Sequence, residues 1–221
     1  MFAQEIAPHV SGATPEIFDA IHEEGVNLAV WERLPDRRTY DAVEALMDTK
    51  SQVRLDVSAP GKATLEALLL SLVASNTPRQ SVFALASDIF NLSRLFGNVA
   101  GLAHPRVRLE RVSDDGCALF HADTLSVRML CTYAGAGTEW LENNNIRRGQ
   151  LGIQGRSIAE ANAAIVQDPA SIRRIPRSHV AILTGRLWPG GEENALVHRS
   201  APVSTPRASR LRLCVDSACD C

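Results

Sequence analysis

Residues 104–112, His-Pro-Arg-Val-Arg-Leu-Glu-Arg-Val, mark the point where the apolar residues change from helical spacing to alternation. Val107 and Leu109 alternate here with Arg106, Arg108 and Glu110, a pattern typical of a strand with one buried face. Short apolar stretches then recur at 117–120, 125–133, 180–183, 195–197 and 210–215. Many short strands separated by turns favour a sandwich or a small barrel. We therefore expect residues 104–221 to form a β-barrel.

Residues 1–103 indicate mainly helices. Thr14-Pro15-Glu16 is typical of a helix start, because a capping hydroxyl precedes a proline at the first helical position. Apolar residues at helical spacing also follow Pro35, and they fill 63–74 and 81–96, where Gly97 is expected to end the helix. Two short strands are expected at 26–31 and 52–57. The prediction is an α+β protein in which a mostly helical region, 1–103, packs against the barrel in one compact unit.

An inserted helical loop is expected within the barrel at about 143–178. The stretch Ser157-Ile-Ala-Glu160 has the spacing of a capping box, in which Ser and Glu satisfy each other's backbone donors at a helix start. The short helix that it opens is expected to end near Val166. The cluster Arg173, Arg174 and Arg177 later in this loop is read as solvated.

Composition excludes several classes of protein. The net charge of the 221 residues is -2, so no basic excess indicates nucleic-acid binding. No apolar run approaches the roughly 18 residues that span a membrane, and the first ten residues do not resemble a signal peptide. A cytoplasmic protein is expected. Cys219 and Cys221 could offer two thiolates to zinc, but a frayed terminus is the preferred interpretation.

The residues that carry chemistry are Phe120-His121-Ala122-Asp123, at the end of one expected strand, and His198, near the end of another. On an extended chain His121 and Asp123 point the same way, so both can face a barrel mouth. Two imidazoles and one carboxylate on one side of a metal ion form a facial triad, which leaves up to three coordination positions open. The set suits Fe(II), and also Mn, Co, Ni or Zn. The alternative is that His121 is simply a hydrogen-bonded polar residue at a strand end.

Five blocks of the sequence resemble the bacterial domain-of-unknown-function family 1826. They are 121–123, 131–141 together with Asn145, 180–189, 197–202 and 210–216. The resemblance covers most of the chain and is specific from about Val107 to Asp216. Ala134 and Ala136 depart from it, because the family tends to have Arg and Pro at these places in the Gly-rich turn. The family is similar, at motif level, to dioxygenases that depend on 2-oxoglutarate and iron.

This resemblance implies a fold and a set of roles. The fold would be a double-stranded β-helix, the jelly-roll or cupin-like barrel. The metal ligands would be His121, Asp123 and His198. The cation that binds the carboxylate of 2-oxoglutarate would be Arg210, with Arg212 as the alternative, and Tyr133 would add a hydroxyl. A guanidinium suits this role because its planar fork grips a carboxylate with two bonds. Without the resemblance, the two arginines are equally well explained as a solvated strand face.

Three further residues are candidates for lining the substrate site. Glu139 and Trp140 follow the Gly-rich turn, and Asn145 ends a polar turn. Residues in such loops often meet a ligand at the mouth of a barrel. The plainer interpretation is that Trp140 covers the core, Glu139 pairs with an arginine, and Asn145 is part of a turn.

Two functions of different classes follow. The first is a non-haem Fe(II), 2-oxoglutarate-dependent dioxygenase with an unknown substrate. The second is a cupin-like protein that holds zinc without turnover, because the resemblance also implies a position near genes for zinc uptake and zinc-responsive regulation. The sequence leaves open the metal, the substrate, and the oligomeric state.

Overall fold

The computed structural model describes residues 8–48, 53–58, 62–72, 77–113, 117–202 and 209–217. Within them, seven strands form a large sheet in the order β1 (His9–Gly12), β2 (Leu28–Trp31), β8 (Val180–Thr184), β5 (Val127–Ala134), β10 (Arg210–Asp216), β4 (Arg106–Val112) and β3 (Arg54–Val57). Three strands form a small sheet in the order β7 (Arg173–Arg174), β6 (Glu139–Leu141) and β9 (Val197–Arg199). β1 and β2 pair in parallel, and the other pairs of neighbouring strands are antiparallel.

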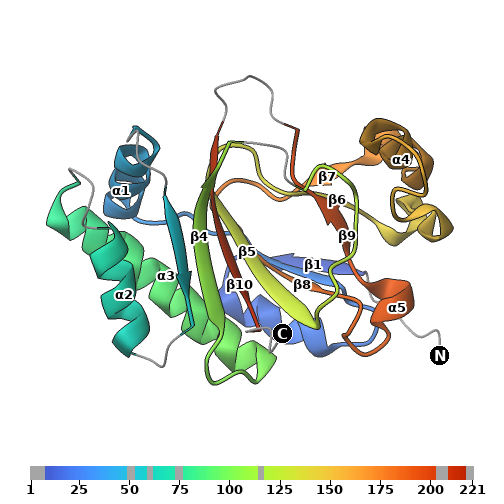
Figure 1. The fold of residues 1–221 in the computed structure, drawn as a ribbon. Helices are drawn as coiled ribbons and strands as arrows, with labels where there is room; N and C mark the ends of the chain where they lie inside the picture. The colour runs from blue at the N-terminus through green and yellow to red at the C-terminus, as the bar shows by residue number, and fades with distance from the viewer. Residues whose placement is uncertain are drawn as a thin grey trace.

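The helices are α1 (Arg37–Asp48), α2 (Lys62–Leu72), α3 (Arg79–Ala100), α4 (Ile158–Ile165) and α5 (Gly191–Asn194). Short 3₁₀ segments occupy Pro15–His22, Asn143–Asn145, Arg148–Gln150 and Pro169–Ser171. In Figure 1 the helices α1, α2 and α3 lie to one side of the large sheet, and the small sheet lies to the other. No described helix has the length and apolar character needed to cross a membrane. The cytoplasmic location stays a prediction.

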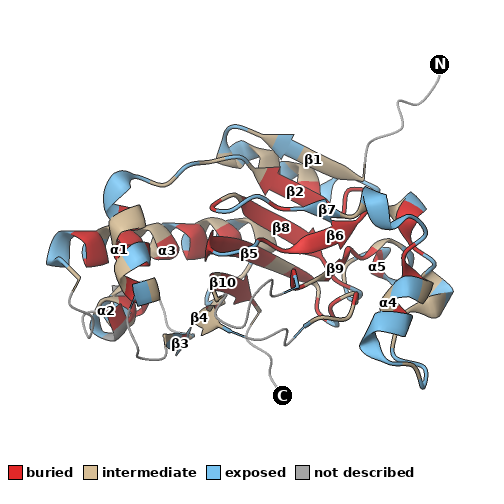
Figure 2. Cartoon of the chain, turned by 90° about the horizontal axis from the view of Figure 1, so that it is seen from above, coloured by how far each residue is buried: buried red, intermediate tan, exposed pale blue. Residues whose placement is uncertain are grey.

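The alternation of side chains along β5 and β10 explains why the large sheet has two buried faces. Met129 and Leu213 point to the helices and join a core cluster with Ile89 of α3. Leu130 and Cys214 point the other way and pack with Trp140 of the small sheet. Figure 2 shows the resulting concentration of buried residues along the central strands. The two layers of core therefore fix the face of the large sheet that meets the small sheet.

The expected strands at 26–31 and 52–57 form, as β2 and β3, but they join the same large sheet as β4, β5, β8 and β10. The sheet is therefore not confined to residues 104–221, and the described residues form two separate sheets rather than a closed barrel. Leu28 and Ala29 are fully buried on opposite faces, which explains why β2 pairs with β8 inside the layers instead of belonging to a separate helical region.

Two expectations about local structure are wrong. α3 does not end at Gly97 but continues to Ala100, and Gly101 ends it with a φ of 66°. Gly97 is needed for packing, because a Cβ there would lie 2.8 Å from the carbonyl oxygen of Leu102. Residues 117–120 are irregular rather than a strand, and only His121 forms an isolated bridge.

The expected capping box forms at the start of α4. The Ser157 side chain accepts a bond from the backbone N–H of Glu160, whose carboxylate accepts one from the Ser157 N–H, and α4 then ends at Ile165. Cys219 and Cys221 lie outside the described residues.

Candidate metal centre

The three predicted ligands come from two parts of the fold. His121 and His198 face each other as a bridge, in which the N–H of each donates to the carbonyl of the other, at 3.0 and 2.9 Å. His198 belongs to β9 of the small sheet, whereas Asp123 follows His121 by two residues and leads into β5 of the large sheet. The site therefore lies where the two sheets meet.

Two polar and steric features hold the segment 118–125 in place. The Asn162 side chain on α4 accepts a bond from the N–H of Phe120 and donates one to the carbonyl of Ala118. On the other side, Gly185 lets the chain after β8 pass against the segment, because a Cβ at this position would overlap the carbonyl of Leu125. Neither residue was expected to matter from the sequence.

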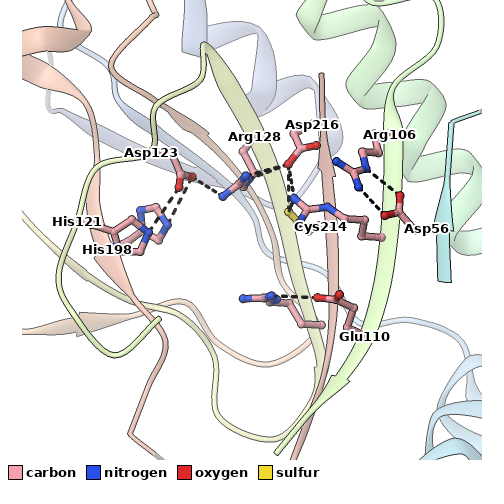
Figure 3. A network of polar contacts seen from close by, with 11 residues as sticks. Asp56, Arg106, Glu110, His121, Asp123, Arg128, His198, Cys214 and Asp216 are labelled. Atoms are coloured by element: carbon pink, nitrogen blue, oxygen red, sulfur yellow. Dashed lines mark hydrogen bonds and ion pairs between the residues drawn. The ribbon is translucent and has the colours of Figure 1, made fainter. Parts of the chain in front are cut away.

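The ligand atoms of the triad have the spacing of a shared metal site (Figure 3). One atom from each of His121, Asp123 and His198 can be chosen so that all lie within 4.8 Å of one another. The Nε2 atoms lie 3.5 Å and 3.6 Å from the two carboxylate oxygens of Asp123, for His121 and His198 respectively. Bonds of about 2.0–2.2 Å from one ion to nitrogen and oxygen ligands are compatible with these separations.

Hydrogen bonds to the backbone leave both imidazoles ready to bind metal. Nδ1 of His121 lies 2.8 Å from the carbonyl oxygen of Leu119, and Nδ1 of His198 lies 3.4 Å from that of Leu196. A carbonyl only accepts, so each Nδ1 carries the proton and each neutral ring keeps its lone pair on Nε2. Second partners of this kind orient metal-binding histidines. The donor set therefore fits a divalent ion.

The charges around the triad favour an ionised carboxylate between histidines of unequal basicity. Burial lowers the pKa of His198 to about 4, so this ring is neutral at physiological pH. Burial acts in the same direction on His121, but hydrogen bonds to Asp123 and the Leu119 carbonyl outweigh it and raise its pKa. Burial disfavours the charged form of Asp123, yet the hydrogen bond to His121 and the charges of His198 and Arg128 keep its pKa well below the usual value.

A chain of ion pairs leads from the triad across the large sheet (Figure 3). Nη1 of Arg128 donates to Asp123 at 2.7 Å, and Nη2 donates to Asp216 on the neighbouring strand at 2.8 Å. Asp216 also accepts from Arg108 of β4, whose guanidinium lies 3.3 Å from the Cys214 sulfur. Burial raises the pKa of this thiol to about 11. Asp123 is thus the end of a fixed network.

A small cavity of about 100 Å³ opens beside the triad. It is lined by both histidines and by four arginines, His121, His198, Arg108, Arg128, Arg199 and Arg212. Thr138, Ser200 and the thiols of Cys117 and Cys214 add polar groups. The arrangement presents a metal site and several guanidinium groups to the same small space, which suits a compact anionic ligand.

The structure brings only one of the three expected cosubstrate residues into this cavity. Arg212 lines it, and its Nη2 donates to Glu110 at 3.2 Å. Arg210 lies on the same face of β10, but it is buried and Nη1 donates to the carbonyl of Ala201. Tyr133 points to the opposite face of the sheet, where its hydroxyl donates to Asp88 of α3 at 2.6 Å. The alternation of side chains along β5 therefore separates Tyr133 from the triad.

The three residues considered for substrate contact have structural partners. Glu139 is buried and accepts bonds from Arg174 and Arg199. Trp140 belongs to the core between the two sheets. Asn145 is buried, and its side chain bonds the backbone of Asp168 in both directions. The plainer interpretation of each residue matches these contacts, although Glu139 acts on the cavity indirectly through Arg199.

Sequence reasoning missed Arg108, Arg128, Arg199 and Asp216. Arg128 could have been identified because it is the one charged residue in the mostly apolar stretch 125–133. An arginine in such a strand is expected to need a charged partner. The pairing of Arg128 with Asp216 follows from the register of β5 and β10, in which these residues are directly opposite. The register between two distant strands cannot be inferred from the sequence of either strand alone.

The family model described as "Protein of unknown function (DUF1826)" matches residues 12–216. The chain belongs to this family. The resemblance seen in the sequence is thereby confirmed for this DUF1826 protein, and all three triad residues lie within the matched span. A search of curated proteins finds no match.

Solved structures similar to this DUF1826 protein include enzymes from plants and bacteria. A dioxygenase for auxin oxidation from rice has 14% identity and a TM-score of 0.49, covering 96% of this chain and 82% of its own. Dioxygenase for auxin oxidation 1 from Arabidopsis thaliana, in a complex with 2-oxoglutarate, has 13% identity and a TM-score of 0.45, covering 96% and 92%. A Pseudomonas putida prolyl-4-hydroxylase has 10% identity and a TM-score of 0.46, covering 97% and 98%.

Proposed function

We propose that this DUF1826 protein is a non-haem Fe(II), 2-oxoglutarate-dependent oxygenase that acts on a small molecule. The observation that carries the proposal is the meeting of His121, Asp123 and His198 at a cavity lined by four arginines. Two imidazoles and one carboxylate hold an ion while leaving open positions, which is the pattern of non-haem iron oxygenases. The adjacent guanidiniums suit a cosubstrate with two carboxylates.

Each part of the chain has a separate task in this proposal. Nε2 of His121, Nε2 of His198 and one oxygen of Asp123 hold the metal, while the Leu119 and Leu196 carbonyls fix the rings. Iron and 2-oxoglutarate together supply the oxidising power for oxygenation of an organic substrate. The core between the sheets excludes water from the inner side of the site, since His198 is only 5% exposed.

The carboxylate of 2-oxoglutarate that lies away from the metal is assigned to Arg212, with Arg210 behind it. Arg212 is the one of the pair that lines the cavity. Its partner Glu110 also lies 3.8 Å from Arg54, so Glu110 keeps a positive neighbour when Arg212 turns to a ligand. Arg210 is buried beside it on the same strand face and contributes positive charge.

The test is a calorimetric titration of 2-oxoglutarate into protein loaded with zinc or, without oxygen, with Fe(II). We expect binding only when metal is present, a visible absorption band with iron, and release of succinate in air. The double variant Arg210→Met, Arg212→Met should lose the binding. Arg106→Met is the matched control, because Arg106 lies on neighbouring β4 and pairs with Asp56 rather than lining the cavity.

The rival function gives a different result in the same experiment. A protein that holds zinc without turnover would bind one zinc ion per chain through the triad and would bind no 2-oxoglutarate. The double arginine variant would then keep its zinc affinity and its biological effect. Stoichiometric zinc with no response to 2-oxoglutarate would overturn the oxygenase proposal.

A further inference from the structure

The four guanidinium groups of the cavity pair with four described carboxylates, and each of these carboxylates also has a second basic partner. Among the described residues that line the cavity, none is an aspartate or a glutamate. The carboxylates that pair with the guanidiniums include Asp216 and Glu110, and Figure 3 shows these ion pairs. The space itself is therefore bounded by cations, imidazoles and small polar groups.

Counting every described partner of these carboxylates gives an excess of two positive charges. Asp123 and Asp216 share Arg128 and Arg108. Glu139 is shared by Arg174 and Arg199, and Glu110 by Arg54 and Arg212. Within the described residues, six arginines thus share four carboxylates. The two additional arginines, Arg54 and Arg174, face solvent, with side chains 74% and 53% exposed, whereas the side chains of the four that line the cavity are only 16–23% exposed. A guanidinium with so little access to water is stabilised by an anion.

A divalent metal and 2-oxoglutarate together leave the charge of the cavity unchanged, because the ion adds two positive charges and 2-oxoglutarate adds two negative charges. Arg212 is assigned to 2-oxoglutarate, and Arg128 is occupied by Asp123 and Asp216 at 2.7 and 2.8 Å. Arg108 and Arg199 are left, one on the large sheet and one at the end of β9.

Arg108 and Arg199 each pair with a carboxylate that also pairs with another arginine. Asp216 keeps Arg128 when Arg108 is taken away, and Glu139 keeps Arg174 when Arg199 is taken away. The Nε atom of Arg108 is buried and makes no hydrogen bond within the described part of the chain. The Arg199 guanidinium lies 4.3 Å from the centre of the Phe120 ring, which holds it beside His121.

We propose that the primary substrate is a small organic anion, whose carboxylate or phosphate group is held by Arg108 and Arg199 while 2-oxoglutarate occupies the metal and Arg212. This assignment rests on the proposed oxygenase function. The cavity, of about 100 Å³, has room for a small anionic group. The oxyanion is the feature recognised, because the planar fork of a guanidinium binds carboxylate and phosphate in the same way.

The experiment uses zinc-loaded protein saturated with 2-oxoglutarate. Inorganic phosphate and malonate are titrated separately by calorimetry, as probes for a phosphate ester and a carboxylate, and uncharged malonamide is the control ligand. We expect one of the two anions to bind with a dissociation constant of about 1 mM or tighter, and malonamide not to bind. Arg108→Met and Arg199→Met should each weaken that binding at least about tenfold, while Arg106→Met should leave it within about twofold.

Three results would overturn the proposal. They are the absence of anion binding to the 2-oxoglutarate complex, equal binding by wild type, Arg108→Met and Arg199→Met, and displacement of 2-oxoglutarate by the anion. Each variant must retain one zinc per chain, and a variant that loses zinc is replaced by Arg108→Lys or Arg199→Lys, which keeps the charge but not the planar fork. If wild type binds no 2-oxoglutarate, the oxygenase proposal fails, and the same titrations on the zinc form still decide whether Arg108 and Arg199 bind an anion.

Discussion

Arg128 holds one oxygen of the Asp123 carboxylate, Oδ2, at 2.7 Å, while the other oxygen, Oδ1, faces Nε2 of His121 at 3.5 Å. The carboxylate is thereby held with Oδ1 toward His121 and with Oδ2 3.6 Å from Nε2 of His198. Asp216 in turn fixes Arg128. Asp123, the only negatively charged ligand of the candidate metal centre, is thus oriented by Arg128, which Asp216 in turn holds in place.

Arg128→Met is predicted to weaken zinc binding by about 10–100-fold, the usual effect of losing a residue that orients a metal ligand. The loss should occur even though a positive charge near the ion is removed, because Asp123 becomes free to rotate. Competition with a chromogenic chelator measures the affinity. Arg106→Met serves as the control, and an unchanged or tighter affinity for Arg128→Met would contradict an orienting role.

Metal binding is predicted to raise thermal stability. An ion present at 100 times its dissociation constant stabilises the folded state by about 2.7 kcal/mol, which corresponds to about 5–10 °C in melting temperature for a chain of this size. Asp123→Asn and His198→Ala should melt at the same temperature with and without zinc. A full zinc-dependent shift in either variant would show that the ion binds elsewhere.

Zinc affinity is predicted to fall as the pH is lowered through the raised pKa of His121. Protons and metal compete for Nε2, so below that pKa the apparent affinity should drop by about tenfold per pH unit. His198 adds no competition until the pH approaches its own pKa of about 4. Zinc titrations between pH 5 and pH 8 test this, and calorimetry in two buffers counts the protons released. A flat profile over this range would exclude His121 as a ligand.

Tyr133→Phe is predicted to lower stability without affecting the site. The hydroxyl donates to Asp88, which also accepts two bonds from Arg33 in the core beneath the helices. Loss of this bond should cost about 1.5–3 kcal/mol, because the acceptor is charged and its side chain is only 18% exposed. Urea unfolding measures the change. Unaltered affinities for zinc and 2-oxoglutarate are expected, and a selective loss of 2-oxoglutarate binding would restore Tyr133 to the site.

The triad could be predicted from sequence because short stretches of the chain are enough to indicate its members. His121 and Asp123 are two residues apart on extended chain, and His198 ends a short apolar stretch, so spacing and residue type suffice. The resemblance to a known family implied Arg210 first and Arg212 as the alternative, and of these two Arg212 lines the cavity. Arg108, Arg128 and Asp216 could not be found, since they meet through the registers of β4, β5 and β10.

The division of the fold was harder to predict for a related reason. β2 and β3 are four residues each and lie among helices, so nothing nearby indicates that they join a sheet whose strands β4, β5, β8 and β10 lie much further along the chain. Their partners are decided by which apolar faces remain to be covered after the chain collapses. Gly97 illustrates the same limit, because it serves close packing inside α3 rather than ending it.

The bridge between His121 and His198 has a mechanical consequence. His121 lies in the segment that leads into the large sheet, and His198 belongs to β9 of the small sheet. An ion held between the two imidazoles would therefore link the two sheets. Removing the ion would weaken the contact between the two sheets, while the hydrogen bonds within each sheet would remain intact. The rates of proteolysis and of backbone amide exchange with deuterium at β6 and β9 should therefore differ between the metal-bound and the metal-free protein.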